Sequence, residues 1–131
     1  MMKFTPALVA CLLIVGTAQA SEHPVEPLAG LPNAVKELRM KALSGNYQAM
    51  RNLGYAYSAG FTPASGNAAP KRLPIAGCAW YLLIPWLNPA ETTSGDTGNI
   101  HLYCGRLSPD QLDTAYRHAI GVRAQMAKRK A

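Results

Sequence analysis

The sequence has few acidic residues, and it lacks the patterns that usually carry catalytic chemistry. Only 7 of its 131 residues are Asp or Glu, against 13 Lys or Arg. Asp110 and Asp113 share one helix turn, but helix capping explains Asp110, and Glu91 and Asp96 are expected in a polar loop. The chain contains no Cys-x-x-C motif and no glycine-rich phosphate-binding loop. We therefore expect no catalytic residues, no metal ligands and no cofactor.

The sequence also lacks, near its start, an apolar run long enough to span a membrane. The run at residues 7–16 falls short of the ~20 residues that a helical span needs. Lys3 precedes it and Ala18-Gln19-Ala20 follows it, so residues 1–20 are interpreted as a bacterial-type secretory signal peptide. This predicts export to the periplasm. Two alternatives stay open, because residues 8–11 look like a lipoprotein processing box and because a signal peptide does not exclude release outside the cell.

Positive charge is sparse over most of the chain and concentrated at its end. Without the signal peptide, residues 21–131 hold 12 basic and 7 acidic side chains, and residues 128–130 supply three of the basic ones. The cations of the basic tail, residues 128–131, suit the C-terminal dipole of a helix. We therefore expect no nucleic-acid partner. We also expect no stable membrane insertion after signal cleavage.

Cysteine is scarce, which makes its pairing easy to predict. Cys11 would leave with the signal peptide, so that Cys78 and Cys104 remain. An even number in an oxidising compartment favours a disulfide. Cys78 is expected early in one helix and Cys104 at the end of the next, so an antiparallel pair brings them together. Closing this loop is worth roughly 3–4 kcal/mol in the chain-entropy model. Two free structural thiols are the alternative.

No alternating strand pattern of useful length is present, and helix signals occur instead. The expected order is an extended leader at 21–32 and one domain at 33–127, whose helices cover residues 34–44, 47–59, about 73–85, about 96–104 and 109–126. Asn33, Asn46 and Ser108 are the expected N-caps. The joints are short, so we expect an all-α fold, a short α-solenoid of about five helices in antiparallel pairs.

One stretch has a familiar spacing. GNYQAMRNLGYAYSAG, residues 45–60, resembles the first helix of a Sel-like repeat, a relative of the tetratricopeptide repeat. The pattern is met by Gly45, Ala49, Leu53, Gly54, Tyr57 and Gly60. Residues 78–81, CAWY, resemble the second helix, and LSPDQLDTAYRHA resembles a closing helix. The resemblance implies a non-catalytic adaptor, envelope regulator or inhibitor that binds another protein, with a periplasmic immunity protein as a special case.

One helix face combines tyrosine and arginine. Tyr47, Arg51 and Tyr55 recur at every fourth position, and Ser58 shares their face. Tyr and Arg are enriched at binding hot spots, and the resemblance implies that first helices line the surface where partners dock. We predict a partner-binding site at these four residues. The alternative is a solvated face on which Arg51 covers a tyrosine ring.

A competing hypothesis is a thiol- or metal-dependent periplasmic enzyme. His101 and Cys104 lie three residues apart, so on a helix they share a face, and a thiol beside an imidazole can act as a nucleophile with its base. Cys78 and His118 would be needed to complete a metal cluster. Zinc sites show tighter, paired ligand spacing than this set. We expect both histidines to be ordinary surface residues.

Overall fold

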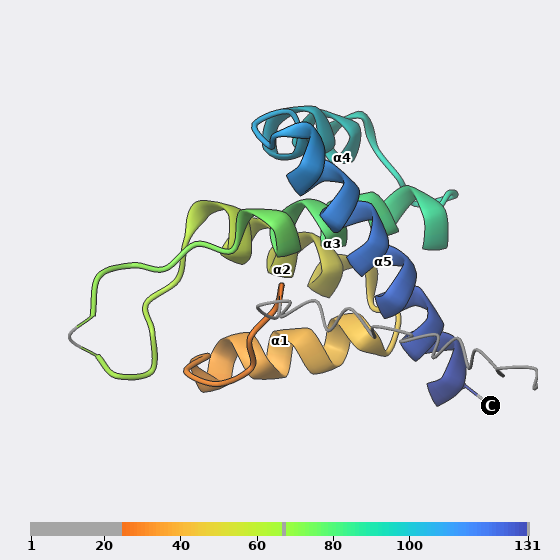
Figure 1. The fold of residues 1–131 in the computed structure, drawn as a ribbon. Helices are drawn as coiled ribbons and strands as arrows, with labels where there is room; N and C mark the ends of the chain where they lie inside the picture. Colours follow the sequence, from red (N-terminus) through yellow and green to blue (C-terminus); the bar gives the residue numbers. More distant parts are fainter. Residues whose placement is uncertain (1–24, 67, 131) are drawn as a thin grey trace, which may run out of the picture.

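The computed structural model describes residues 25–66 and 68–130, and these residues form an all-α fold (Figure 1). The elements are α1 (Asn33–Leu43), α2 (Tyr47–Ala59), α3 (Pro74–Leu87), α4 (Ser94–Asn99), the π-helical turn η1 (Ile100–Cys104) and α5 (Pro109–Arg129). Among the described residues, β pairing is limited to one antiparallel bridge between Phe61 and Lys71. The all-α prediction is confirmed. The predicted signal peptide, residues 1–20, lies outside the described residues.

The first two helices form where local signals place them. Gly45, with φ +93°, ends the chain's path out of α1, and the Asn46 side chain accepts a hydrogen bond from the Ala49 amide at the start of α2. The start of α1 differs by one residue from the prediction. Pro32 occupies the N-cap and Asn33 is already helical, without a side-chain cap. The ring of Pro32 holds φ at −63°, which prepares the chain for the helix.

Small residues let α2 and α3 pack closely. The Cα of Gly54 lies under the ring of Tyr81, and a Cβ there would be 3.1 Å from that ring. Four residues along each helix, in opposite directions, Gly77 faces Ser58. These two contacts establish that α2 and α3 are antiparallel neighbours. They also explain why the predicted repeat pattern has small residues at these positions.

Helix α3 is the central element, and α5 crosses it diagonally (Figure 1). The expected end near Pro85 is wrong by two residues, because α3 continues through Pro85 to Leu87. A proline in the last turn removes one backbone hydrogen bond, but its fixed φ is compatible with a helix. The core around α3 contains Trp80, Leu83 and Ile84, all with 0% exposure. The packed faces predicted for the other helices are buried as well: Val35, Ala42, Ala49, Met50, Leu53, Tyr57, Ala115, Ala119 and Val122.

The segment predicted as one helix at 96–104 is two elements. α4 begins two residues earlier, because Thr93 and Asp96 form a reciprocal capping box. The backbone then widens into η1, whose last residue is Cys104. The predicted disulfide is present, with an S–S distance of 2.05 Å and a Cα–Cα distance of 5.0 Å between Cys78 and Cys104. It ties the end of η1 to the first half of α3.

The leader predicted at 21–32 is described from residue 25, and it is packed rather than merely extended. Leu31 is 2% exposed and belongs to the core. Glu26 is 6% exposed, although it lies in a segment that has three prolines and few apolar residues. The segment is held in place by this carboxylate, whose surroundings are described below.

Candidate functional site

The first half of the predicted tyrosine–arginine face contacts the protein itself. The Tyr47 hydroxyl donates a hydrogen bond to Oδ2 of Asp96. The Nε of Arg51 lies 2.7 Å from Oδ1 of the same carboxylate, as an ion pair whose N–H is not aligned for a hydrogen bond. Asp96 is fully buried, so its predicted position in a polar loop is wrong. Tyr47 and Arg51 therefore anchor α4 to α2.

The electrostatics of this anchor keep Asp96 ionised. Burial raises the pKa of Asp96, but hydrogen bonds from Tyr47 and Thr93 and the charge of Arg51 lower it further, so the net pKa lies below its ordinary value. The same hydrogen bond raises the pKa of Tyr47. A buried charge is tolerated where it is paired and hydrogen-bonded, as it is here. The carboxylate has a structural task, and its oxygens are already occupied.

Ser58 is not on an exposed face. It is 7% exposed, because it lies on the side of α2 that meets α3, opposite Gly77. At 100° per residue, Ser58 falls between Tyr47 and Arg51 around the helix axis, and this part of α2 is covered by α3 and α4. Ser58 is therefore too buried to contact a partner directly.

The exposed part of this region is centred on Tyr55, which is 59% exposed. Beside it, the Tyr103 ring stacks on the buried Tyr81 ring at 5.4 Å with an interplanar angle of 3°. The Arg106 guanidinium lies 5.6 Å from the centre of the Tyr103 ring. Burial raises the pKa of Tyr81 to about 12, and both Tyr103 and Tyr55 add to the increase, which places Tyr55 near the same stack.

We name this region the Tyr55 surface. It consists of Arg51, Tyr55, Tyr103 and Arg106. Two of its members come from α2 and two from η1 or the loop after it. Sequence reasoning missed Tyr103 and Arg106, which flank Cys104 and Gly105. The predicted disulfide offered a signal, because it brings the residues around Cys104 to the α2–α3 pair.

The alternative thiol or metal site is not assembled. The Sγ of Cys104 is bonded to Cys78, so the structure holds no free thiol at this position. His101 is exposed, whereas His118 lies on α5 with its Nε2 2.9 Å from Oε2 of Glu26. Within residues 25–66 and 68–130, no three His, Cys, Asp or Glu residues are grouped so that they could hold a metal ion. The prediction that His118 is a plain surface residue is wrong, because it contacts Glu26.

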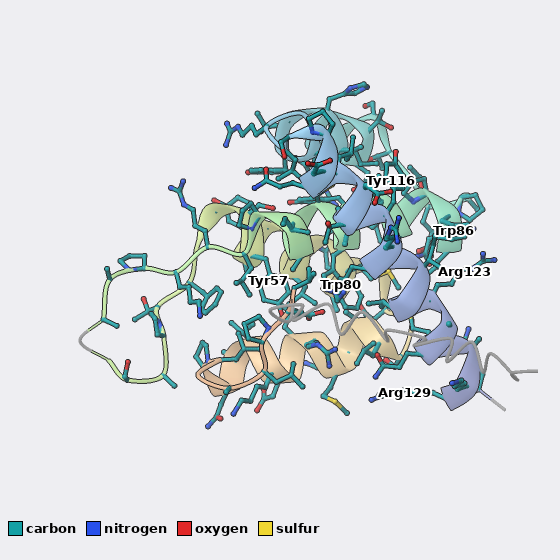
Figure 2. All side chains as sticks on the ribbon, in the orientation of Figure 1. Tyr57, Trp80, Trp86, Tyr116, Arg123 and Arg129 are labelled. Atoms are coloured by element: carbon teal, nitrogen blue, oxygen red, sulfur yellow. A yellow bond between two sulfur atoms is a disulfide. The ribbon has the colours of Figure 1, made fainter. Side chains whose placement is uncertain are left out.

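Glu26 is the centre of a second buried polar cluster. Its Oε1 accepts hydrogen bonds from Arg39 Nε at 2.6 Å, from the Tyr57 hydroxyl at 2.7 Å and from Trp80 Nε1 at 3.3 Å. With His118 on Oε2, the carboxylate contacts α1, α2, α3 and α5 at once. Figure 2 shows Tyr57 and Trp80 directed toward the chain segment that carries Glu26. One side chain thus connects the N-terminal segment to four helices.

The surroundings of Glu26 favour its charged form. Burial raises the pKa of Glu26, but hydrogen bonds from His118, Tyr57 and Arg39 and the charge of Arg39 lower it by more. Burial and the neighbouring carboxylate raise the pKa of Tyr57 well above its ordinary value. Tyr57 therefore stays protonated as a donor. The cluster is a satisfied network, which rigidifies the core and carries no nucleophile.

A cavity of about 470 Å³ lies beside this cluster, between α1 and α5. Three cationic side chains line it: Arg39, Arg117 and His118. Arg39 and His118 are paired with Glu26, and Arg117 is paired with Asp113 at 2.8 Å. The positive charges of the cavity are thus neutralised within the protein.

Comparisons with known proteins leave the fold and surfaces above as the basis for function. No family model, no curated protein sequence and no solved structure matches this chain. In the part of the chain that the structure describes, no helix is both long and apolar enough to cross a membrane.

Proposed function

We propose that this protein is an exported, non-catalytic protein-interaction module, a short helical solenoid of Sel-like type that acts in the periplasm. Its partner is another protein, and the Tyr55 surface binds it. An adaptor, an inhibitor or an immunity-type protein would each use such a surface. The proposal keeps Arg51 and Tyr55 from the predicted site and replaces Tyr47 and Ser58 with Tyr103 and Arg106.

The observation that carries the proposal is the exposure of Tyr55 beside a rigid aromatic stack. Tyr and Arg are enriched at binding hot spots because they offer large contact areas and several hydrogen bonds. Tyr103 is held by its stacking on Tyr81, so little conformational entropy is lost when a partner covers it. A π-helical turn next to the surface supports the same view, since such turns recur at functional sites.

The disulfide supports the exported location. Disulfides persist in the periplasm and outside cells and are rare in the reducing cytosol. Cys78–Cys104 also holds η1 in the position from which Tyr103 and Arg106 reach the surface. Mass spectrometry of the protein recovered from the periplasm tests export directly. The expected N-terminus is Ser21, with a gain of about 2 Da on reduction.

Affinity capture from an envelope extract tests the binding surface. We expect the Tyr55→Ser, Arg106→Glu double variant to lose a protein that the parent retains. A matched control exists on α5, where Tyr116 is 51% exposed and Arg117 lies at the surface. The Tyr116→Ser, Arg117→Glu variant carries the same chemical change and should retain the partner. The proposal is wrong if both variants capture the same proteins as the parent.

A further inference from the structure

The C-terminal end of α5 forms a second surface that the proposed function does not use. α5 has 21 residues, so it is roughly 30 Å long and reaches past α3 to the turn between α1 and α2 (Figure 1). Two cavities, of about 220 and 460 Å³, lie against its last turns. Both are lined by Met126 and Lys130, so they are parts of one groove on either side of the helix end.

The bottom of this groove is apolar. Met126 of α5 lies there with Met50 of α2, Leu87 of α3 and Leu43 of α1. These side chains come from four helices, so the floor is a property of the fold and not of the helix end alone. Two of them are methionines, whose flexible thioethers adapt to differently shaped apolar groups. The floor is suited to receive a bulky apolar side chain.

The rim of the groove is basic. Arg123 and Lys130 line the smaller cavity, and Arg129 and Lys130 line the larger one. Among the described residues that line either cavity, none is Asp or Glu. This contrasts with the cavity beside Glu26, whose cations are paired with carboxylates. Cations suit the dipole of a helix end, but that role requires no cavity between them.

One exposed aromatic residue borders the groove. Trp86 is 43% exposed, and the Arg123 guanidinium lies 4.1 Å from the centre of its ring (Figure 2). Figure 2 shows Trp86 and Arg123 together beside α5, with Arg129 farther toward its end. We define the α5 groove by Met50, Leu87, Trp86, Arg123, Met126, Arg129 and Lys130. A tryptophan stacked by arginine beside an apolar floor is the composition of a binding hot spot.

We propose that the α5 groove binds an acidic polypeptide segment that carries bulky apolar side chains. The carboxylates of the segment would pair with Arg123, Arg129 and Lys130, and its apolar side chains would fill the floor. Charge complementarity favours this occupant over a basic or neutral one. The concave shape favours a peptide over a flat membrane surface, on which a protruding tryptophan would be expected.

Trp86 provides a direct measure of binding. The second tryptophan, Trp80, is fully buried in the core and should not respond. The probe is a short fluorescein-labelled peptide in which glutamates alternate with leucine and phenylalanine, titrated into the full mature protein. We expect a saturable rise in anisotropy with a matching change in tryptophan emission, and an affinity that falls as salt is added. In Trp86→Phe, the emission change should vanish.

Charge variants locate the site. The Arg129→Glu, Lys130→Glu variant should bind the peptide roughly tenfold more weakly. The Lys36→Glu, Lys71→Glu variant has the same net charge but changes exposed residues outside the groove, so it should bind within about twofold of the parent. If glutamate frays the helix end, as circular dichroism would show, the Arg129→Gln, Lys130→Gln variant replaces the first one and should weaken binding several-fold.

Four results would overturn the proposal. They are absence of saturable peptide binding, equal weakening in both charge variants, equal binding of a control peptide with lysine in place of glutamate, and peptide binding without any response of Trp86. Binding of phosphatidylglycerol vesicles in place of the peptide would assign the groove to a membrane surface. The result is independent of the Tyr55 surface, whose variants should bind the peptide like the parent.

Discussion

Replacing Glu26 should destabilise this protein more than replacing most core residues, although Glu26 lies in a segment without secondary structure. The side chain is 6% exposed and interacts with Arg39, Tyr57, Trp80 and His118. Glu26→Ala would leave a buried hydroxyl and a buried indole N–H without an acceptor, and Arg39 without its counter-ion. Each unsatisfied buried group costs about 1–3 kcal/mol, and breaking a buried ion pair costs about 3–5 kcal/mol.

These costs overlap, so we expect Glu26→Ala to lower the free energy of unfolding by about 4 kcal/mol. For a domain of this size that corresponds to a decrease in Tm of roughly 15 °C. Glu26→Gln should cost less, about 2–3 kcal/mol, because its amide oxygen still accepts from Tyr57 and Trp80. Thermal and urea unfolding, followed by circular dichroism, measure both values. Glu37→Gln, on the exposed side of α1, is the matched control and should change stability by less than about 0.5 kcal/mol.

The charge of Glu26 also predicts a pH dependence. Its pKa in the folded protein is lower than the ordinary value of 4.5, so the unfolded chain binds the proton more readily. The stabilisation by this carboxylate is therefore fully present above pH 4.5 and is lost as the pH falls through the folded-state pKa. The difference in unfolding free energy between the parent and Glu26→Gln should shrink below pH 4.5. Other carboxylates, such as Asp96, titrate in both proteins and cancel from this difference.

Two outcomes would refute this reasoning. If Glu26→Ala unfolds within about 2 °C of the parent, Glu26 does not connect the segment to the helices in solution. If the difference between the parent and Glu26→Gln is the same at neutral pH and at about pH 3, the charge of Glu26 contributes nothing and only its shape matters. The Glu37→Gln control separates these outcomes from a general effect of net charge.

Three further predictions concern stability. Gly77→Ala should destabilise by about 1–3 kcal/mol because its Cβ would lie less than 3.0 Å from Oγ of Ser58, whereas Gly121→Ala, with nothing within 4 Å, should stabilise by about 0.5–1 kcal/mol; chemical denaturation gives both values. Reduction of the disulfide should cost roughly 3–4 kcal/mol, seen as a lower Tm with reductant. Asp96→Asn should cost about 2–3 kcal/mol, and hydrogen exchange should show faster opening of α4 than of α2.

The helices could be predicted because each depends on local signals. Asn46 caps α2 through its own third neighbour, and Ser108 and Gln111 form the capping box of α5 within one turn. Periodicity then identifies the buried side of each helix, since a residue's direction repeats every 3.6 positions. The disulfide could be predicted for a similar reason. Only two cysteines remain after the proposed cleavage, and the antiparallel order of α3 and the following helix leaves one way to pair them.

The polar contacts could not be predicted, because they join residues that are far apart in the sequence. Glu26 meets His118 across 92 positions, and Asp96 meets Tyr47 across 49. A carboxylate in a proline-rich or polar segment has the same local pattern whether it is solvated or buried. Only the meeting of several helices at one point decides that it is buried, and this depends on crossing angles that periodicity does not contain.

This difference explains why the predicted binding face changed. A helical projection placed Tyr47, Arg51, Tyr55 and Ser58 on one face, but it cannot show which part of that face a later element covers. α4 covers the first half through Asp96, and α3 covers Ser58, so only Tyr55 stays well exposed. The same packing brings η1 beside Tyr55, held there by the disulfide. The exposed surface is therefore made by the disulfide and the buried Asp96 together. Loosening either one should weaken partner binding without touching the Tyr55 side chain.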